Sequence, residues 1–376
     1  MEMATLILNS GQCSWGKCIF CGYGKIYKKR TNKELREILD KFFAGINTGD
    51  NEDKKIKIFG SGSFFDEKQI PKEIFEYFVE KCRENKISEI YVESRPEFIT
   101  KEKILCLKET KAEINIAIGL ESASDRILKT INKGFKVKDF EKSANLIHSL
   151  NCKVRTYLLV NLPVKNRKAE LEKSVNYALN FSDSIVLINL LPHENSEIFD
   201  LWIKGEWKFL NKEEFFGAVN NWKNNEKIEL DAETFKFIPR FRDTKILDGV
   251  GEEFLTHPYF EVWQDYLQRW YKKQANKDIV LFLPCSAKKP YSESETHKKI
   301  LDVLRMLDRD KYNSIHHVMI SNPGVIPREF ENFPFNAYNW DEKLENEFIK
   351  KRYIEVTKER IRAYLKSQKY NEFFVF

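Results

Sequence analysis

The stretch GQCSWGKCIFCGYG, residues 11–24, carries three of the seven cysteines of the chain. Cys13, Cys18 and Cys21 follow a C-x4-C-x2-C pattern, and no fourth cysteine lies close to them. No histidine precedes His148, so a structural zinc site, which needs four closed ligands, would have to recruit a distant side chain. Three thiolates suit instead a cubane iron–sulfur cluster with one iron left open. The spacing favours the cluster, and zinc remains the alternative.

Apolar runs of strand length alternate with helix-period segments through residues 1–225. The strands are predicted at residues 5–9, 55–60, 89–94, 114–121, 154–162 and 184–191. This regular alternation indicates an α/β fold with a parallel sheet, either open or part of a barrel. Chemistry in such folds gathers at the C-terminal ends of the strands. The cysteines follow the first strand, and GSGSF, SRPE and GLES mark the ends of the next three, so the site is predicted at this edge.

Three regions are predicted along the 376 residues. Residues 1–225 form the β/α core, and residues 226–276, an extended segment and an aromatic helix, close this first domain. Residues 277–376 form a smaller α/β domain that begins with the buried strand 278–284 and includes a charged helix at about 341–367. The final YNEFFVF is predicted to be an apolar strand, which would expose an apolar sheet edge. Such an edge indicates either a truncated domain or one that a partner chain completes.

Composition limits the class of protein. The net charge of +6, from 63 basic and 57 acidic residues, is compatible with a nucleic-acid partner. No apolar run reaches the roughly 18 residues of a membrane span, and the apolar N-terminus lacks the basic region of a secretory signal. A cytoplasmic protein is therefore expected, and in that reducing compartment clustered cysteines indicate a metal site or catalysis.

The cysteine motif, placed directly after the first strand of a β/α series, resembles that of the radical S-adenosylmethionine (SAM) superfamily. The fold of that superfamily is a partial (β/α)6 barrel, and its usual spacing is C-x3-C-x2-C, so here one more residue separates Cys13 from Cys18. The resemblance implies a [4Fe–4S] cluster on Cys13, Cys18 and Cys21, with SAM bound at the open iron. It also implies an electron donor, because reductive cleavage of SAM gives the 5′-deoxyadenosyl radical.

Two further stretches match the superfamily by position. FGSGSF, residues 59–64, matches the glycine-rich turn that holds the methionyl amino group. GLES, residues 119–122, matches the fourth-strand motif, whose acidic residue contacts the ribose or the methionine portion of SAM. A buried Glu121 is costly unless it has a partner, which favours this ligand role over a structural one. Arg155 and Asn161 on the fifth predicted strand and Asn189 on the sixth are additional candidates for the cavity wall, although ordinary strand-end capping would also explain all three. The cofactor-binding residues predicted in this way are Gly60, Ser61, Gly62, Glu121, Ser122 and Asn161.

A second motif, PCSAKKPYSESETH at residues 284–297, follows the first predicted strand of the smaller domain. It could be a solvated turn with a helix N-cap at Ser292 or Ser294, or it could hold a nucleophilic Cys285–His297 pair. The loop resembles the P-C-x3-K-P-Y-x2-S-x2-H motif of the archaeosine synthase family, which attaches lysine to 7-cyano-7-deazaguanine in tRNA. Residues 321–341 resemble the segment that follows in that family. The matching motif residues are Cys285, Lys289, Tyr291, Ser294 and His297.

VESRPEFIT (92–100), IGLESASDRIL (118–128) and INKGF (131–135) resemble the radical enzyme of archaeosine formation, over roughly residues 1–270. The resemblance implies that a hydrogen is taken from the lysine carbon next to the nitrogen and that the C–N bond of the lysine adduct breaks. The formamidine group of archaeosine then stays on the base. The implied partners are tRNA, archaeosine synthase as the lysine-transferring subunit, and an electron donor. Whether residues 277–376 catalyse a step or only bind tRNA or the synthase stays open, and the catalytic residues are unassigned.

Three other functions compete with this one. A methylthiotransferase would need a second cluster domain, for which the residues before Cys13 leave no room. An Elongator-like enzyme would need an acetyltransferase domain, and residues 277–376 show no acetyl-coenzyme A turn. A zinc-containing tRNA-binding protein would use basic residues on phosphates and aromatic residues on bases.

Overall fold

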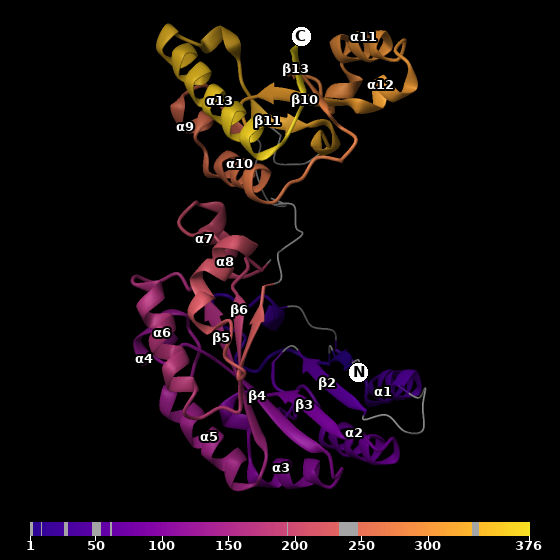
Figure 1. Ribbon diagram of the computed structural model, residues 1–376, viewed down its shortest axis with the longest axis vertical. Helices are drawn as coiled ribbons and strands as arrows, with labels where there is room; N and C mark the ends of the chain where they lie inside the picture. Colours follow the sequence, from indigo (N-terminus) through magenta and orange to yellow (C-terminus); the bar gives the residue numbers. More distant parts are fainter. Residues whose placement is uncertain are drawn as a thin grey trace. The chain divides into compact units, whose positions relative to one another are not determined.

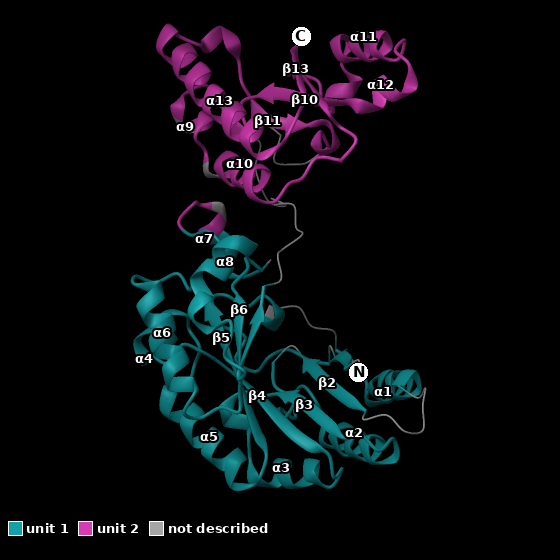
Figure 2. Cartoon of the chain, in the orientation of Figure 1, with its two compact units in different colours: residues 1–200, 207–234 teal, residues 201–206, 235–376 magenta. Residues whose placement is uncertain are grey.

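The computed structural model describes residues 3–8, 10–25, 29–46, 54–60, 62–193, 195–232, 247–332 and 338–376. The chain divides into two compact units (Figure 2). Unit 1 comprises residues 1–200 and 207–234, and unit 2 comprises residues 201–206 and 235–376.

Unit 1 is built on a seven-stranded parallel sheet in which every strand pairs with its neighbours in sequence (Figure 1). The strands are β1 (Ala4–Leu8), β2 (Lys55–Gly60), β3 (Glu89–Glu93), β4 (Glu113–Glu121), β5 (Lys153–Val160), β6 (Ser184–Asn189) and β7 (Ile228–Asp231). Parallel neighbours need crossover connections, and helices supply them. The helices are α1 (Asn32–Ile46), α2 (Lys72–Glu84), α3 (Lys101–Lys108), α4 (Asp125–Thr130), α5 (Val137–Ser149), α6 (Arg167–Ala178), α7 (Glu197–Ile203), which ends beyond the unit division, and α8 (Lys212–Val219).

The predicted α/β class and partial-barrel arrangement are confirmed, and the six predicted strands lie within two residues of the observed ones. The sheet has a seventh strand, β7, which pairs with β6. The sequence indicated only an extended segment there, because four residues are too few for a clear alternation. The remainder of that segment, residues 233–246, lies outside the described residues.

The two faces of β3 show how this sheet positions a site. Ile90 and Val92 are almost fully buried, as expected for the face that helices cover. Glu89, Tyr91 and Glu93 alternate with them and therefore point to the opposite face. The opposite face is thus polar along this strand, and a polar interior can hold a ligand where an apolar core could not.

Unit 2 contains a four-stranded sheet in the order β11–β10–β9–β13. β10 and β13 run parallel to β9, and β11 is antiparallel to β10. The elements of this sheet are β9 (Ile279–Pro284), β10 (Ile315–Ser321), β11 (Gly324–Pro327) and β13 (Glu372–Val375). Two short strands, β8 (Leu247–Asp248) and β12 (Tyr338–Asn339), pair separately. The helices are α9 (Glu252–Leu255), α10 (Pro258–Arg269), α11 (Glu295–Leu304), α12 (Arg309–Ser314) and α13 (Glu347–Ser367). Among the described helices, none is long and apolar enough to serve as a membrane span.

The aromatic helix α10 belongs to unit 2. The indole N–H of Trp263 donates to the carbonyl of Val325 at 2.9 Å, and Gln264 donates to the carbonyl of Pro323 at 2.7 Å. The expectation that this helix closes the first domain is therefore wrong, and the chain divides near residue 234 rather than near 276. The sequence periodicity shows that the helix has an apolar face. Which domain this face packs against depends on the tertiary structure.

The C-terminal strand β13 lies at an edge of the unit 2 sheet, as the sequence predicted. Its side chains Phe373, Phe374 and Val375 are 55%, 51% and 76% exposed. The expected apolar edge is thus present in the described part of the chain.

Arg360 on α13 stabilises unit 2 through a buried network. Its guanidinium donates to the carbonyls of Asn322 at 2.9 Å and Leu255 at 2.7 Å, and to the carboxylate of Glu261 at 2.5 Å. Replacing Arg360 by Met should lower the free energy of unfolding by about 2–4 kcal/mol, because buried acceptors lose their donors.

Hydrogen exchange of α13 peptides, measured by mass spectrometry, would report this loss. The matched control is Arg362→Met on the exposed side of the same helix, which should leave the exchange unchanged. Equal exchange in the two variants would show that the network contributes little.

Candidate cofactor site

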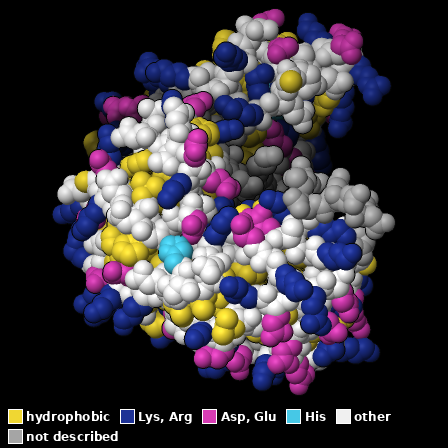
Figure 3. All heavy atoms as spheres, turned by 60° about the horizontal axis from the view of Figure 1, so that its bottom comes forward, with side chains coloured by type: hydrophobic (Ala, Val, Ile, Leu, Met, Phe, Trp, Pro, Cys, Tyr) yellow, Lys and Arg dark blue, Asp and Glu magenta, His cyan; other side chains and the backbone are white. Residues whose placement is uncertain are grey.

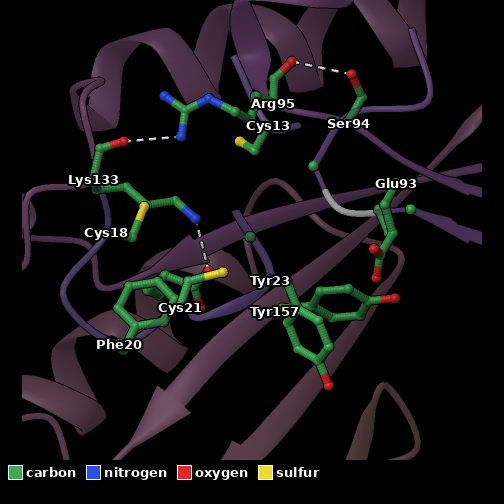
Figure 4. Close-up of a pocket in the computed structure, with 15 residues that line it drawn as sticks. Cys13, Cys18, Phe20, Cys21, Tyr23, Glu93, Ser94, Arg95, Lys133 and Tyr157 are labelled. Carbon is green, nitrogen blue, oxygen red and sulfur yellow. Dashed lines mark hydrogen bonds and ion pairs between the residues drawn. The ribbon is translucent and has the colours of Figure 1, made fainter. Parts of the chain in front are cut away.

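A cavity of about 180 Å³ lies at the C-terminal ends of the unit 1 strands (Figure 4). It combines thiols, glycines and a small set of charged and aromatic side chains. The lining residues are Cys13, Cys18, Phe20, Cys21, Tyr23, Gly60, Gly62, Glu93, Ser94, Arg95, Ala117, Gly119, Glu121, Lys133 and Tyr157. The site therefore lies at the sheet edge where the strand-end rule predicted it.

The three cysteines of the loop after β1 all line this cavity, and all are free thiols. Burial raises the pKa of Cys18 to about 11 and also raises the pKa of Cys21. A cationic metal centre is what would hold such buried thiols as thiolates. Within the described ranges, no three Cys, His, Asp or Glu side chains converge tightly enough to hold a single metal ion.

The glycine-rich turn after β2 approaches the cysteine loop closely. A Cβ atom on Gly62 would lie 2.9 Å from Sγ of Cys13 and 2.8 Å from Nε2 of Gln69. Only a residue without a side chain fits at this position. Gly60 and Gly62 line the cavity as predicted, whereas Ser61 lies outside the described residues.

Glu121 enters the cavity through an irregular end of β4. The register with β5 shifts between Gly119 and Glu121, and Glu121 has φ = 64°, a left-handed conformation that is unfavourable for this residue type. A Cβ atom on Gly119 would lie 2.4 Å from Oε1 of Glu121, so the missing side chain makes room for the carboxylate. Lys133 donates to the same oxygen at 2.8 Å, and both side chains are over 90% buried. The sequence indicated the cofactor as the partner of buried Glu121, whereas the structure pairs it with Lys133, and a cofactor contact by Glu121 stays a prediction.

Arg95 supplies a second buried cation. Its Nε donates to Glu97 at 2.5 Å. Its Nη1 donates to the carbonyl of Lys133 at 3.0 Å (Figure 4). Its Nη2 is buried without a hydrogen-bond acceptor among the described residues. The guanidinium also lies over the rings of Trp15 and Phe135, 5.5 and 5.3 Å from their centroids. A buried donor without an acceptor indicates that an anionic group is missing from the cavity.

These features fit a [4Fe–4S] cluster with SAM. The three thiols can bind iron, and the turn at Gly62 leaves backbone groups accessible to the amino group of SAM. The Nη2 group of Arg95, which has no acceptor among the described residues, suits the carboxylate of SAM. The donor set therefore agrees with the cofactor pair implied by the sequence.

Two predicted cofactor residues do not line the cavity. The hydroxyl of Ser122 accepts from Ser174 at 3.4 Å. The side chain of Asn161 accepts from Arg167 at 2.8 Å and donates to the carbonyl of Lys208 at 2.8 Å. These contacts hold strand ends and loops together, and the geometry gives no support for a cofactor contact by either residue.

Arg155 and Asn189, the further candidates for the cavity wall, also have structural partners. Arg155 donates to Glu229 on β7 and to Ser184 at 3.3 Å, and Asn189 donates to the carbonyl of Leu210 at 2.9 Å. For these two residues, strand-end capping is the better explanation.

Several cavity residues were not predicted individually. Glu93 and Arg95 follow directly from the strand-end rule applied to β3, since they lie in the stretch VESRPEFIT. Lys133 lies in the stretch INKGF, which the sequence singled out without a role. Tyr157 stands within β5 and no local signal marks it. Pairing between strands, which brings Tyr157 opposite Gly119, decides its place.

In unit 2, the predicted Cys285–His297 nucleophilic pair is not formed. Nε2 of His297 lies 2.8 Å from the carbonyl of Pro284, and Nδ1 lies 2.9 Å from a guanidinium nitrogen of Arg328. Nε2 therefore donates and Nδ1 accepts, which leaves no ring nitrogen for a thiol. Burial, and then the charge of Arg328, lower the pKa of His297, so the ring stays neutral. Ser294 is the N-cap of α11, as the simpler interpretation expected.

The other motif residues of unit 2 gather around Tyr338. Nζ of Lys289 donates to the carbonyl of Tyr338 at 3.2 Å and lies 3.7 Å from the centroid of its ring. Burial lowers the pKa of Lys289 to about 8. The hydroxyl groups of Tyr291 and Ser321 are 3.2 Å apart. Whether this cluster acts chemically stays a prediction.

Comparison with family models identifies both parts of the chain. Residues 10–178 match the model of the radical SAM superfamily, and this range contains the cysteine loop and strands β2 to β5. Residues 10–178 are a radical SAM domain. Its cofactors are a [4Fe–4S] cluster and SAM. Residues 260–376 match a domain of unknown function, DUF5591, which spans most of unit 2.

Three curated proteins are similar to parts of this chain. Archaeosine synthase subunit beta of Methanosarcina acetivorans is 30% identical over 220 residues, which are 54% of this chain and 62% of that protein. Archaeosine synthase subunit alpha of Thermoplasma acidophilum is 39% identical over 89 residues, 23% of this chain and 16% of that protein. The tRNA uridine(34) acetyltransferase of Methanocaldococcus infernus is 23% identical over 307 residues, 68% of this chain and 55% of that protein. The chain therefore spans less than two thirds of each relative's length.

Removing one thiol should abolish cluster assembly in the radical SAM domain. In Cys18→Ala, iron content after anaerobic reconstitution should fall from about four atoms per chain to nearly none, because two thiolates do not retain a cubane cluster. Iron analysis and electron paramagnetic resonance would measure this. Cys106→Ala, on α3 and outside the cavity, is the matched control and should keep its cluster. Full iron content in Cys18→Ala would exclude Cys18 as a ligand.

Gly62→Ala should also reduce cluster content, since the new methyl group would collide with Cys13 and Gln69. Iron occupancy measured beside wild type is the readout. Gly217→Ala on α8, where a Cβ atom meets nothing within 4 Å, should keep full occupancy. Unchanged iron in Gly62→Ala would mean that the turn moves freely away from the cysteine loop.

Proposed function

We propose that this protein is a radical SAM lyase that cleaves the C–N bond of the lysine adduct on 7-deazaguanine in tRNA and so forms archaeosine. The observation that carries the proposal is the similarity of one chain to proteins named as both subunits of archaeosine synthase, beside a cavity built for a three-cysteine cluster. When bound, the cluster and SAM supply a 5′-deoxyadenosyl radical, which is suited to breaking an unactivated C–N bond.

The residues of the cavity have distinct tasks in this proposal. Cys13, Cys18 and Cys21 would hold the cluster, and Arg95 would hold the carboxylate of SAM. The buried Glu121–Lys133 pair would hold the end of β4 in place.

The proposed partners are tRNA, the lysine-transferring subunit of archaeosine synthase and an electron donor. On the face shown in Figure 3, the described Lys and Arg side chains are mixed with Asp and Glu side chains rather than gathered into one basic surface. Charge on this face therefore does not mark where RNA binds, and the proposal of tRNA rests on the relatives' names.

A second candidate is another radical SAM reaction on tRNA. The similarity to a tRNA uridine(34) acetyltransferase over 307 residues favours it, because that alignment covers 68% of the chain. The higher identity to archaeosine synthase subunit beta, 30%, favours archaeosine formation.

The decisive assay uses the anaerobically reconstituted protein, SAM, a chemical reductant and tRNA that carries the lysine adduct. Wild type should convert the adduct to archaeosine, seen by mass spectrometry of the digested nucleosides, and Cys18→Ala should show less than about 1% of this conversion because it lacks the cluster. The same assay with unmodified tRNA and acetyl-coenzyme A tests the second candidate. An acetylated uridine without any archaeosine would overturn the proposal.

A further inference from the structure

The cofactor cavity has a second wall that the cluster and SAM do not explain. Figure 4 shows Glu93 and Tyr157 on one side of the pocket, away from Cys18 and Lys133. Glu93 is the last residue of β3, and Tyr157 belongs to β5. These two polar side chains come from strands on either side of β4.

The strand between them leaves space. Ala117 on β4 is paired with Glu93, and Gly119 on β4 is paired with Tyr157. Both small residues line the cavity. Glu93 and Tyr157 therefore flank a floor without bulky side chains, on which a flat substrate group can lie.

Among the residues that the structure describes, Glu93 lacks the ion pair that three other carboxylates of this sheet region form. Glu121 is paired with Lys133, Glu89 with Lys55, and Glu229 with Arg155. Within the described residues, no ion pair is formed by Glu93, although its carboxyl lies beside the hydroxyl of Tyr157. Its side chain stays partly exposed, and the space it faces is the cavity.

The surroundings of Glu93 show what it lacks. The pKa of Glu93 is raised to about 7, chiefly by burial and in part by the charge of Glu121, and Tyr157, Lys133 and Arg155 offset only some of this effect. A buried carboxylate at neutral pH is costly without an opposite charge. A cation brought by a ligand would remove that cost.

We infer that Glu93, oriented by Tyr157, binds a cationic nitrogen group of the substrate over the floor formed by Ala117 and Gly119. The identity of this group as an amidinium rests on the proposed function, because the lysine adduct carries an amidinium at the C–N bond to be cleaved. A planar amidinium presents two parallel N–H donors, which match the two oxygens of a carboxylate. Glu93 would thereby place the scissile bond opposite the cluster wall.

The phosphates of tRNA are excluded as the group bound here, because a carboxylate repels them. The carboxylate of SAM is excluded for the same reason and has Arg95 as its donor. The amino or ribose groups of SAM are the competing occupants of this wall, and the test below separates them from substrate.

Binding of a small probe tests the inference without the full reaction. The probe is N-butylformamidinium, and its neutral counterpart is N-butylformamide, each added to the cluster-reconstituted protein with SAM and followed by ligand-observed nuclear magnetic resonance. Wild type should bind the amidinium at least about tenfold more tightly than the amide, as expected for a charge-assisted pair. Glu93→Gln should abolish this preference, and Tyr157→Phe should reduce it.

The pH dependence gives an independent readout. Because the pKa of Glu93 is raised, its carboxyl is neutral below about pH 7 and charged above it. Amidinium binding by wild type should therefore strengthen between pH 6 and 8, while the probe stays protonated, and Glu93→Gln should show no such change. Glu113→Gln, on β4 but outside the cavity, controls for the loss of a carboxylate and should behave as wild type.

Two outcomes would overturn the inference. One is an unchanged preference for the amidinium in Glu93→Gln. The other is a loss of SAM binding in Glu93→Gln, measured by equilibrium dialysis, with probe binding intact, since Glu93 would then bind the cofactor.

The conversion of lysine-adduct tRNA by wild type tests the proposed reaction separately. An amidinium preference without conversion would support the binding role of Glu93 and refute the proposed reaction. Conversion by wild type together with an unchanged amidinium preference in Glu93→Gln would support the proposed reaction and refute the binding role of Glu93.

Discussion

The buried ion pair between Glu121 and Lys133 is the interaction on which the cofactor cavity depends. It joins the end of β4 to the loop that follows α4, and both side chains are almost fully removed from solvent. Removing one partner from such a pair typically costs 3–5 kcal/mol, because the remaining charge has no compensation. The pair also keeps Glu121 in a left-handed conformation that this residue would not adopt by itself. The geometry of this wall is therefore fixed before any ligand arrives.

The sequence predicted those features that local pattern determines. Strand periodicity located six strands of the sheet, and the spacing of Cys13, Cys18 and Cys21 located the cofactor loop. Glu121 was predicted to contact the cofactor, because an acidic residue at a buried strand end needs a partner. The partner in the structure is Lys133, which could not be derived because it lies twelve positions away and only the fold brings the two together.

The errors have a common physical cause. Asn161 was expected at the cofactor because it ends a strand, yet a polar side chain at a strand end can equally bind the neighbouring loop, as Asn161 does with Lys208. The aromatic helix α10 was assigned to the wrong unit, because an apolar helix face does not indicate which of two domain cores the helix packs against. In unit 2, His297 has the residue type of a catalytic base, but both its nitrogens are used to hold the motif loop. Residue type and spacing limit the possible roles, and the hydrogen-bond partners choose among them.

The exposed edge of β13 affects the behaviour of the protein in concentrated solution. Phe373, Phe374 and Val375 combine high β-propensity with apolar side chains, and the backbone on the open side of an edge strand is a template for another strand. Two molecules that meet along this edge can extend each other's sheet without unfolding. This segment of four residues therefore favours self-association, and a single lysine introduced there would act as a gatekeeper against it.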